Sequence, residues 1–351
     1  MTKLIIQIPC LNEAATLPAT VRDLPRAIPG IDRVELLVID DGSRDDTAKA
    51  ARASGVDHVV RFPRQKGLAA AFMAGIDASL KRGADFIVNT DADNQYAGQD
   101  IQKLLAPLLA GDADIVIGDR NIQALQSMSP SRKLLQRVGS WVVRQVSGTQ
   151  VPDTTSGFRA YTREAALRMM IVSDFSYTLE SIIQAGKKRM AIAHVPVATN
   201  PRLRESRLFQ SAYDYVKRSA ATIVRIYAMY EPLKVFTYIG LAVFTSGFLI
   251  SLRFLFYYFT GSGLGHLQSL ILSAVLMIVG FQVLLIGLVS DVLSANRKLL
   301  EDILYRVRSM ELAQEQVRPK PDSTPVSPPL EPDGAARPLT GAGQRPDRWE
   351  R

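Results

Sequence analysis

Residues 34–43 read VELLVIDDGS, an apolar run that ends in two aspartates, a glycine and a serine. A short apolar run closed by turn residues predicts a strand buried inside a sheet. Runs of the same kind recur in the first half of the chain, at Leu4–Ile8, His58–Phe62, Phe86–Asn89 and Asp114–Ile117. Helical patterns separate them, at Ala14–Leu24, Thr47–Ala53, Gly67–Leu80 and Gln99–Leu109. This alternation predicts an α/β fold with a mostly parallel sheet covered by helices on both faces.

Polar motifs follow three of these strands. They are Asn12-Glu13 after the first, Asp40-Asp41-Gly42 after the second and Asp91-Ala92-Asp93 after the fourth. In such sheets ligands bind beyond the carboxyl ends of the strands, so the motifs predict one common site. Residues 40–43 also have a structural interpretation as a turn and helix cap, and both roles can hold together.

The segment after the fourth strand carries two aspartates with one residue between them. Asp91 and Asp93 project to the same side of an extended chain, where two carboxylates repel each other unless a cation lies between them. Mg²⁺ or Mn²⁺ prefers such oxygen ligands and is the natural partner of a pyrophosphate. The motif predicts a metal site at Asp91 and Asp93, with Gln95 as a third ligand, although solvated loop aspartates of this spacing are common.

The charge of the chain indicates its partners. The 351 residues carry a formal net charge of +8, and the basic residues concentrate just before the apolar segments. No zinc-finger spacing and no RNA-binding aromatic signature is present in the sequence, so we expect a membrane surface and phosphate groups as partners and no nucleic acid. Cys10 is the single cysteine, which excludes a disulfide within the chain.

The last 150 residues change character. Basic and apolar residues alternate from Arg202 to Glu231, which predicts either a helix in the headgroup plane or one packed on the protein's own surface. Val235–Phe259 and Leu267–Leu293 are each long enough to cross a bilayer. The short linker between them lacks Lys and Arg, whereas both outer flanks are basic. This predicts a transmembrane hairpin with the first domain and both termini in the cytoplasm.

These features predict five segments: a catalytic domain at 1–205, an amphipathic helix at 206–232, the hairpin at 233–295, a further cytoplasmic helix at 296–314 and a disordered tail at 315–351. The helix at 296–314 carries Leu299, Leu300, Ile303, Leu304 and Val307 on one face. It is expected to lie on the membrane or to pair with another subunit, which would make the protein a homo-oligomer.

Five motifs occur in a fixed order: IPCLNE at 8–13, VIDDGS at 38–43, KG at 66–67, DAD at 91–93 and DTTSGFR at 153–159. In this order the chain resembles the family 2 glycosyltransferases of GT-A fold, within them the dolichol-phosphate mannose synthase and polyprenyl-phosphate glycosyltransferase branch. The resemblance covers roughly the first 230 residues and loosely the hairpin. It implies a nucleotide-sugar donor, with a GDP- or a UDP-sugar left open, a polyprenyl phosphate acceptor and an inverting, metal-dependent transfer.

The resemblance also implies residue roles. Pro9, Glu13, Asp40, Asp41 and Lys66 match donor-binding positions, and Asp91, Asp93 and Gln95 match the metal ligands. The arginines implied in catalysis are Arg120 toward the donor, Arg132 toward the acceptor phosphate, and Arg202 and Arg207 in a loop that closes over the pyrophosphate.

The chain departs from the family pattern at Tyr96, at Arg204 and at Gln136, where the family usually has a histidine, a glycine and a serine. Two alternatives stay open. One is a transferase with a hydroxyl acceptor, in which a carboxylate such as Asp153 would act as the base. The other is a non-catalytic nucleotide-binding membrane scaffold.

Overall fold

The computed structural model describes residues 1–121, 130–172, 177–201, 212–261 and 267–317. Arg202 and Arg207, and the tail expected at 315–351 except for its first three residues, lie outside the described residues.

A seven-stranded sheet forms the centre of the first domain, in the order β3-β2-β1-β4-β6-β5-β7. The strands are β1 (Lys3–Cys10), β2 (Arg33–Asp40), β3 (His58–Arg61), β4 (Phe86–Asn89), β5 (Ile115–Asp119), β6 (Arg159–Thr162) and β7 (Ile192–Pro196). β6 runs antiparallel between β4 and β5, and the other pairs are parallel. The predicted α/β fold with a mostly parallel sheet is confirmed.

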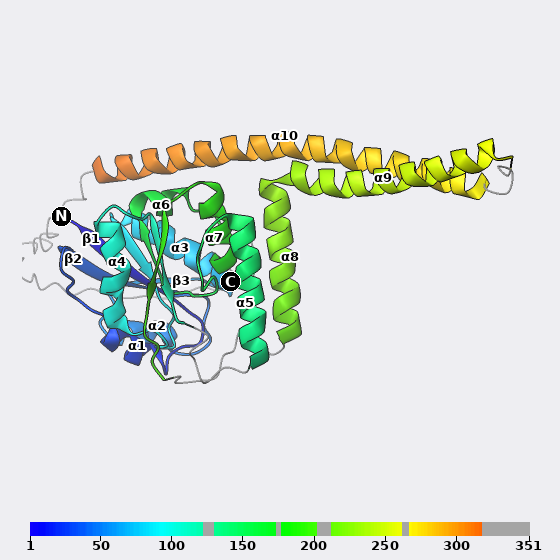
Figure 1. The fold of residues 1–351 in the computed structure, drawn as a ribbon. Helices are drawn as coiled ribbons and strands as arrows, with labels where there is room; N and C mark the ends of the chain where they lie inside the picture. The colour runs from blue at the N-terminus through cyan, green and yellow to red at the C-terminus, as the bar shows by residue number, and fades with distance from the viewer. Residues whose placement is uncertain (122–129, 173–176, 202–211, 262–266, 318–351) are drawn as a thin grey trace, which may run out of the picture.

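Helices cover both faces of this sheet (Figure 1). One face packs against α1 (Leu17–Asp23), α2 (Thr47–Ala53) and α4 (Ile101–Leu109), which follows the short helix η1 (Gly98–Asp100). The other face packs against α3 (Leu68–Lys81), α5 (Pro130–Ser147), α6 (Arg163–Arg168) and α7 (Tyr177–Lys187). Because both faces are covered, the carboxyl ends of the parallel strands are the open edge at which a site can form.

The helix α8 (Ala212–Tyr230) packs against the hydrophobic core on the side of the sheet covered by α3, α5, α6 and α7. Its apolar residues Ile223 and Ile226 are buried there, while Lys217, Val224 and Arg225 are exposed. Of the two alternatives for this segment, packing on the protein's own surface describes Ile223 and Ile226, because the domain itself covers them. α8 runs across the direction of the two long helices that follow (Figure 1).

The two long helices α9 (Pro232–Phe259) and α10 (Leu267–Val317) lie side by side as a hairpin. Both are long and apolar enough to cross a membrane. They approach closely at Gly280, where an added Cβ would lie 2.5 Å from the backbone nitrogen of Phe244. Small residues permit this kind of packing between helices in lipid.

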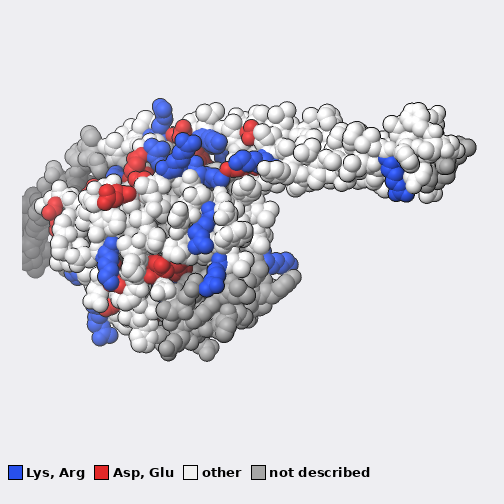
Figure 2. All heavy atoms as spheres, viewed as in Figure 1, with Lys and Arg blue, Asp and Glu red and all other residues white. Residues whose placement is uncertain are grey.

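α10 continues for 51 residues without a break, so residues 296–314 are part of the second long helix rather than a separate one. Its C-terminal half docks on the first domain. Tyr305 Oη donates to Glu164 Oε2 at 3.0 Å, Lys188 Nζ lies 3.0 Å from Glu301 Oε2, and Leu312 is buried. Figure 2 shows charged side chains gathered where α10 crosses the domain and few on the hairpin beyond it.

Candidate active site

The loops that follow β1 and β2 are joined to each other by hydrogen bonds. The backbone nitrogen of Asn12 donates to Ser43 Oγ at 2.9 Å, and that of Glu13 donates to Thr47 Oγ1 at 2.9 Å. Pro9 lies within β1, one residue before its end, and is buried. The Glu13 carboxylate accepts from Thr16 Oγ1 at 2.6 Å, so this carboxylate is held at the strand end.

The two aspartates after β2 are held mainly by backbone amides. Asp40 Oδ1 accepts from the nitrogen of Ser43 at 2.8 Å. The two oxygens of Asp41 accept from the nitrogens of Lys66 at 2.7 Å and Gly67 at 2.9 Å, just before α3 begins. The geometry displays the turn of the structural interpretation, whereas α2 has no side-chain cap at its N-cap residue Asp46. Donor binding by the same carboxylates stays a prediction.

Lys66, the remaining residue predicted to bind the donor, is exposed. Its ammonium lies 4.8 Å from the centre of the Phe62 ring.

Asp91 and Asp93 follow β4 and are half-buried. Burial, and then the negative charge of Asp93, raise the pKa of Asp91 to about 6, while the nearby Arg120 and Arg159 oppose the rise. Asn94 turns the chain with a φ of 55°, and the nitrogen of Gln95 donates to Asp93 Oδ1 at 3.2 Å. The structure thus brings the three predicted metal ligands into one short turn.

This turn fits a hard divalent cation. A positive charge between Asp91 and Asp93 would offset the repulsion and the desolvation that disfavour the ionised pair. Asn94 Oδ1 is buried and accepts no hydrogen bond from any described residue, so it offers a neutral oxygen nearby. Among the described residues no group of three or more acidic, cysteine or histidine side chains could hold a metal, so donor phosphate oxygens would have to complete the coordination.

A buried hydrogen-bond network lies next to Asp91. Asn89 Nδ2 donates to the carbonyl oxygen of Gly157 and to Tyr177 Oη, each at 2.8 Å. The nitrogen of Gly157 donates to Tyr96 Oη at 3.1 Å. A Cβ at Gly157 would lie 2.8 Å from Asp91 Oδ1, so only glycine leaves the carboxylate in place. No pattern in the sequence had predicted a role for Gly157 or Tyr177.

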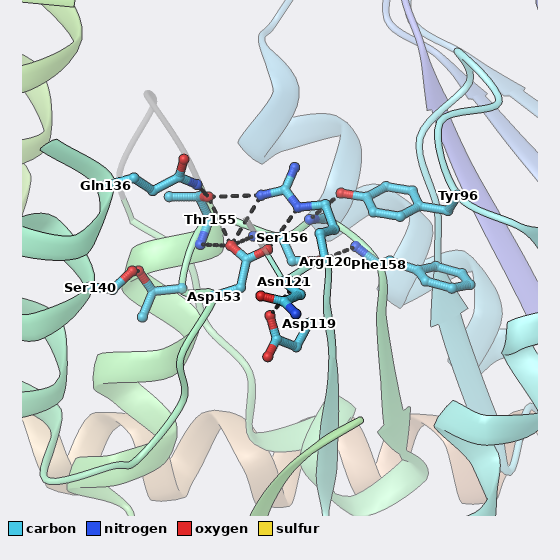
Figure 3. A network of polar contacts seen from close by, with 12 residues as sticks. Tyr96, Asp119, Arg120, Asn121, Gln136, Ser140, Asp153, Thr155, Ser156 and Phe158 are labelled. Carbon is cyan, nitrogen blue, oxygen red and sulfur yellow. Dashed lines mark hydrogen bonds and ion pairs between the residues drawn. The ribbon is translucent and has the colours of Figure 1, made fainter. Parts of the chain in front are cut away.

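Arg120, at the end of β5, is held in a bidentate ion pair (Figure 3). Its Nε and Nη2 donate to Asp153 Oδ2 at 2.7 Å and Oδ1 at 3.0 Å, and Nη2 also donates to Thr155 Oγ1 at 2.9 Å. Burial alone would raise the pKa of Asp153, but the Arg120 guanidinium lowers it below its ordinary value. Arg120 also lies over the ring of Tyr96, which connects this pair to the turn of Asp91.

α5 docks on the same loop. Gln136 Nε2 donates to Thr155 Oγ1, and the hydroxyls of Ser140 and Thr154 lie 3.1 Å apart. Arg132 lies one turn before Gln136 on this helix, but its side chain is outside the described residues. The helix that bears the predicted acceptor arginine therefore contacts the Arg120 network through Gln136.

Arg159 is a functional candidate that was quoted in a motif but given no role. Its side chain is fully buried and donates to the carbonyl oxygens of Ser156 at 2.7 Å and Thr154 at 3.0 Å, and to Ser181 Oγ at 2.6 Å. A buried arginine that holds several carbonyls fixes the shape of the loop between Asp153 and β6. Its position directly after Gly157-Phe158 is the signal that could have identified it.

Comparison with known families supports the architecture. Residues 5–169 match the model of glycosyl transferase family 2, and residues 231–295 match that of the GtrB C-terminal hairpin. The second match spans α9 and the first part of α10.

Similar proteins cover most of the first domain. Polyprenol monophosphomannose synthase of Mycolicibacterium smegmatis is 29% identical over 209 residues, 56% of this chain and 77% of that one. Undecaprenyl-phosphate mannosyltransferase of Micrococcus luteus is 30% identical over 200 residues, 54% of this chain and 80% of that one. Glycosyltransferase AglJ of Haloferax volcanii is 29% identical over 308 residues, 85% of this chain and 96% of that one.

A solved structure shares the fold. Glucosyl-3-phosphoglycerate synthase from Mycobacterium tuberculosis, in complex with Mn²⁺, UDP-glucose and phosphoglyceric acid, matches with a TM-score of 0.52 at 23% identity. The match covers 65% of this chain and 80% of that chain. At this identity the likeness establishes the GT-A-like fold.

Proposed function

The chain belongs to glycosyl transferase family 2, and from this premise we propose that it moves a sugar from a nucleotide-diphosphate sugar to a polyprenyl phosphate in a membrane. The observation that carries the proposal is the turn of Asp91 and Asp93, held beside Arg120 at the strand ends of a domain that is fixed to an apolar hairpin. The relatives named for mannosyl transfer to polyprenol and undecaprenyl phosphate support this choice of acceptor.

On the donor side, Asp91 and Asp93 would hold Mg²⁺ or Mn²⁺, with Gln95 or Asn94 as a neutral ligand. A bound divalent cation stabilises the negative charge that develops on the departing nucleotide diphosphate. Glu13, Asp40 and Asp41 line the neighbouring strand ends where the base and ribose would lie. Arg202 and Arg207 are proposed to close over the pyrophosphate.

On the acceptor side, the state of Asp153 favours a phosphate over a hydroxyl. A hydroxyl acceptor needs a general base, but both oxygens of Asp153 are engaged by Arg120 and its pKa is lowered. A phosphate oxygen is already anionic near neutral pH and needs an arginine clamp rather than a base. Arg132 on α5 is proposed to supply that clamp. Attack from the face opposite the leaving group would invert the anomeric centre.

The two apolar helices support a membrane location. The basic flanks on both sides of the hairpin favour a topology in which the catalytic domain and both termini lie in the cytoplasm. In that position the site would meet a polyprenyl phosphate at the cytoplasmic face.

The test pairs two acceptors that differ only in the phosphate. Purified full-length protein in vesicles is given Mn²⁺, undecaprenyl phosphate or undecaprenol, and radiolabelled GDP-mannose, UDP-glucose or UDP-N-acetylglucosamine. Lipid-linked label with the phosphate alone is the expected result. Label on undecaprenol would contradict the assignment of a phosphate acceptor. No transfer with any of the three donors would contradict the proposed activity for these donor classes.

Asp93→Asn tests the metal assignment. We expect loss of transfer in this variant, and loss of transfer in the wild type on chelation by EDTA with recovery on adding Mn²⁺ or Mg²⁺. Asp112→Asn, at an exposed turn outside the site, is the matched control. Full transfer by Asp93→Asn would contradict the assignment.

A further inference from the structure

The C-terminal half of α10 has two opposite faces. One face, which includes Tyr305, Arg308 and Leu312, packs on the catalytic domain. The other is an exposed apolar stripe made of Leu299, Leu300, Ile303, Val307 and Met310, each between 47% and 65% exposed. No described part of the chain covers it, and α10 forms the outer border of the molecule there (Figure 1).

Lipid does not cover this stripe if the hairpin crosses a bilayer. α10 is one uninterrupted helix, so the stripe continues along the axis of the spanning segment instead of turning into the membrane plane. At about 1.5 Å per residue, Met310 lies roughly 25 Å beyond Leu293, the end of the expected span. Exposed apolar stripes of this kind mark protein contacts.

The spacing of the stripe identifies its partner. Leu300, Ile303, Val307 and Met310 follow the alternating three- and four-residue spacing of a coiled-coil seam, and Asn296 precedes them on the same line. A seam of this type is self-complementary, since each apolar residue fills a space between its counterparts on an identical helix. We propose that this stripe, the α10 seam, is a parallel helix–helix interface with a second copy of the chain.

Two features support a parallel arrangement. Copies inserted in one bilayer have the same orientation, so their α10 helices point the same way. The seam is flanked by Arg306 on one side and Glu311 on the other, both exposed, although Glu311 Oε1 also lies 4.0 Å from Lys81 Nζ of its own chain. These occupy the flanking positions that meet between parallel helices, where Arg306 of one copy faces Glu311 of the other. The tail at 318–351 is a poor alternative occupant because it is rich in proline and charge and has no apolar repeat.

Cysteine crosslinking tests the proposal directly, because Cys10 is the single cysteine and is buried. In a Cys10→Ala background, Val307→Cys and Ile303→Cys are oxidised in native membranes. Asp302→Cys, exposed but off the seam, is the matched control. We expect a disulfide-linked dimer from both seam variants and little from the control. Equal crosslinking of all three, or none from the seam variants, would overturn the proposal.

A charge exchange supplies a second measurement. Arg306→Glu and Glu311→Arg are each expected to reduce the yield of the Val307→Cys dimer, and the double exchange to restore it. A dimer yield that is the same in all charge variants would contradict the parallel pairing. A light-scattering mass of one chain for the wild type in mild detergent would also contradict it. A third measurement compares maleimide labelling of Val307→Cys in the full chain and in a chain truncated after Val317. Labelling that appears only after truncation would show that the tail covers the seam, and it would contradict the proposal.

The interface goes beyond the proposed transfer reaction and does not depend on it. Crosslinking without sugar transfer would leave the interface standing and remove only the proposed function. Sugar transfer without crosslinking would leave the proposed function standing and remove only the interface.

Discussion

At the scale of single residues, the site depends on glycine as much as on charge. Gly157 passes beneath Asp91, and the missing side chain is what leaves room for the carboxylate. Tyr96, which stands where the family usually has a histidine, accepts a hydrogen bond from Gly157 and stacks on Phe158 with ring centres 4.8 Å apart. The departure at Tyr96 is thus accommodated by a different contact in the same place.

Gly157→Ala should therefore impair the site without unfolding the protein. The added Cβ must displace Asp91, so we expect about a 100-fold loss of transfer from misplacement of the ligand. Overpacking should cost about 2 kcal/mol of stability. Gly139→Ala, on α5 where a Cβ meets nothing within 4 Å, is the control and should keep activity and melting temperature. Equal activity of the two variants would contradict this role for Gly157.

Asp153→Asn should separate the structural from the catalytic role of this carboxylate. It leaves Arg120 buried without its ionic partner, which should cost about 3 kcal/mol at pH 7. The pKa of Asp153 is lowered in the folded state. Its contribution is therefore present above the ordinary carboxyl pKa and lost as the pH falls through the lowered value. Denaturant unfolding of both proteins between pH 7 and pH 3 measures this. A stability difference that grows toward low pH would refute the assignment.

At the scale of elements, the sequence predicted β1 to β5 well and the antiparallel β6 poorly. β1, β2 and β4 are nearly continuous apolar runs, because strands covered on both faces must be apolar. β6 reads Arg-Ala-Tyr-Thr, and its buried arginine resembles no apolar run. The strand can lie in the middle of the sheet because the buried Arg159 donates hydrogen bonds to Ser156, Thr154 and Ser181, and these contacts are visible only in the folded structure.

The contacts of α10 were also beyond reach of the sequence. Leu300 and Leu312 look alike in a helical pattern, yet Leu300 is exposed and Leu312 is buried against the domain. Which face of α10 contacts the domain depends on the direction in which the helix leaves the hairpin. A local sequence pattern does not predict that direction. The sequence indicated the residues of the site through their order along the chain, but not Gly157 or Tyr177, which act through shape.

The docking of α10 should depend on Glu301. This buried carboxylate lies 3.0 Å from Lys188 Nζ and 2.9 Å from Arg297 Nε. Glu301→Ala removes the carboxylate that both cations contact, which should weaken the docking of α10 by about 2 kcal/mol. Hydrogen exchange in residues 297–312 should then become faster than in the wild type. Asp302→Ala, exposed on the same turn, is the control, and equal exchange in both variants would show that Glu301 is dispensable.

At the scale of the whole molecule, the hairpin and the domain form one connected body. The predicted topology puts the turn of the hairpin on the side opposite the domain. Thr260→Cys should therefore react with an impermeant maleimide added outside intact cells, while Asp302→Cys should react only in inverted vesicles. Both sites are exposed, so burial does not confuse the readout. Labelling of both from the same side would contradict the hairpin topology.

The unbroken course of α10 from the hairpin onto the domain has a kinetic consequence. A catalytic domain that cannot leave the bilayer searches for its lipid in two dimensions, by lateral diffusion. Its rate should then follow the mole fraction of acceptor in the membrane instead of the amount per volume of buffer. Diluting vesicles of fixed composition at saturating donor should leave the turnover per enzyme unchanged, whereas diluting the acceptor with inert lipid should lower it.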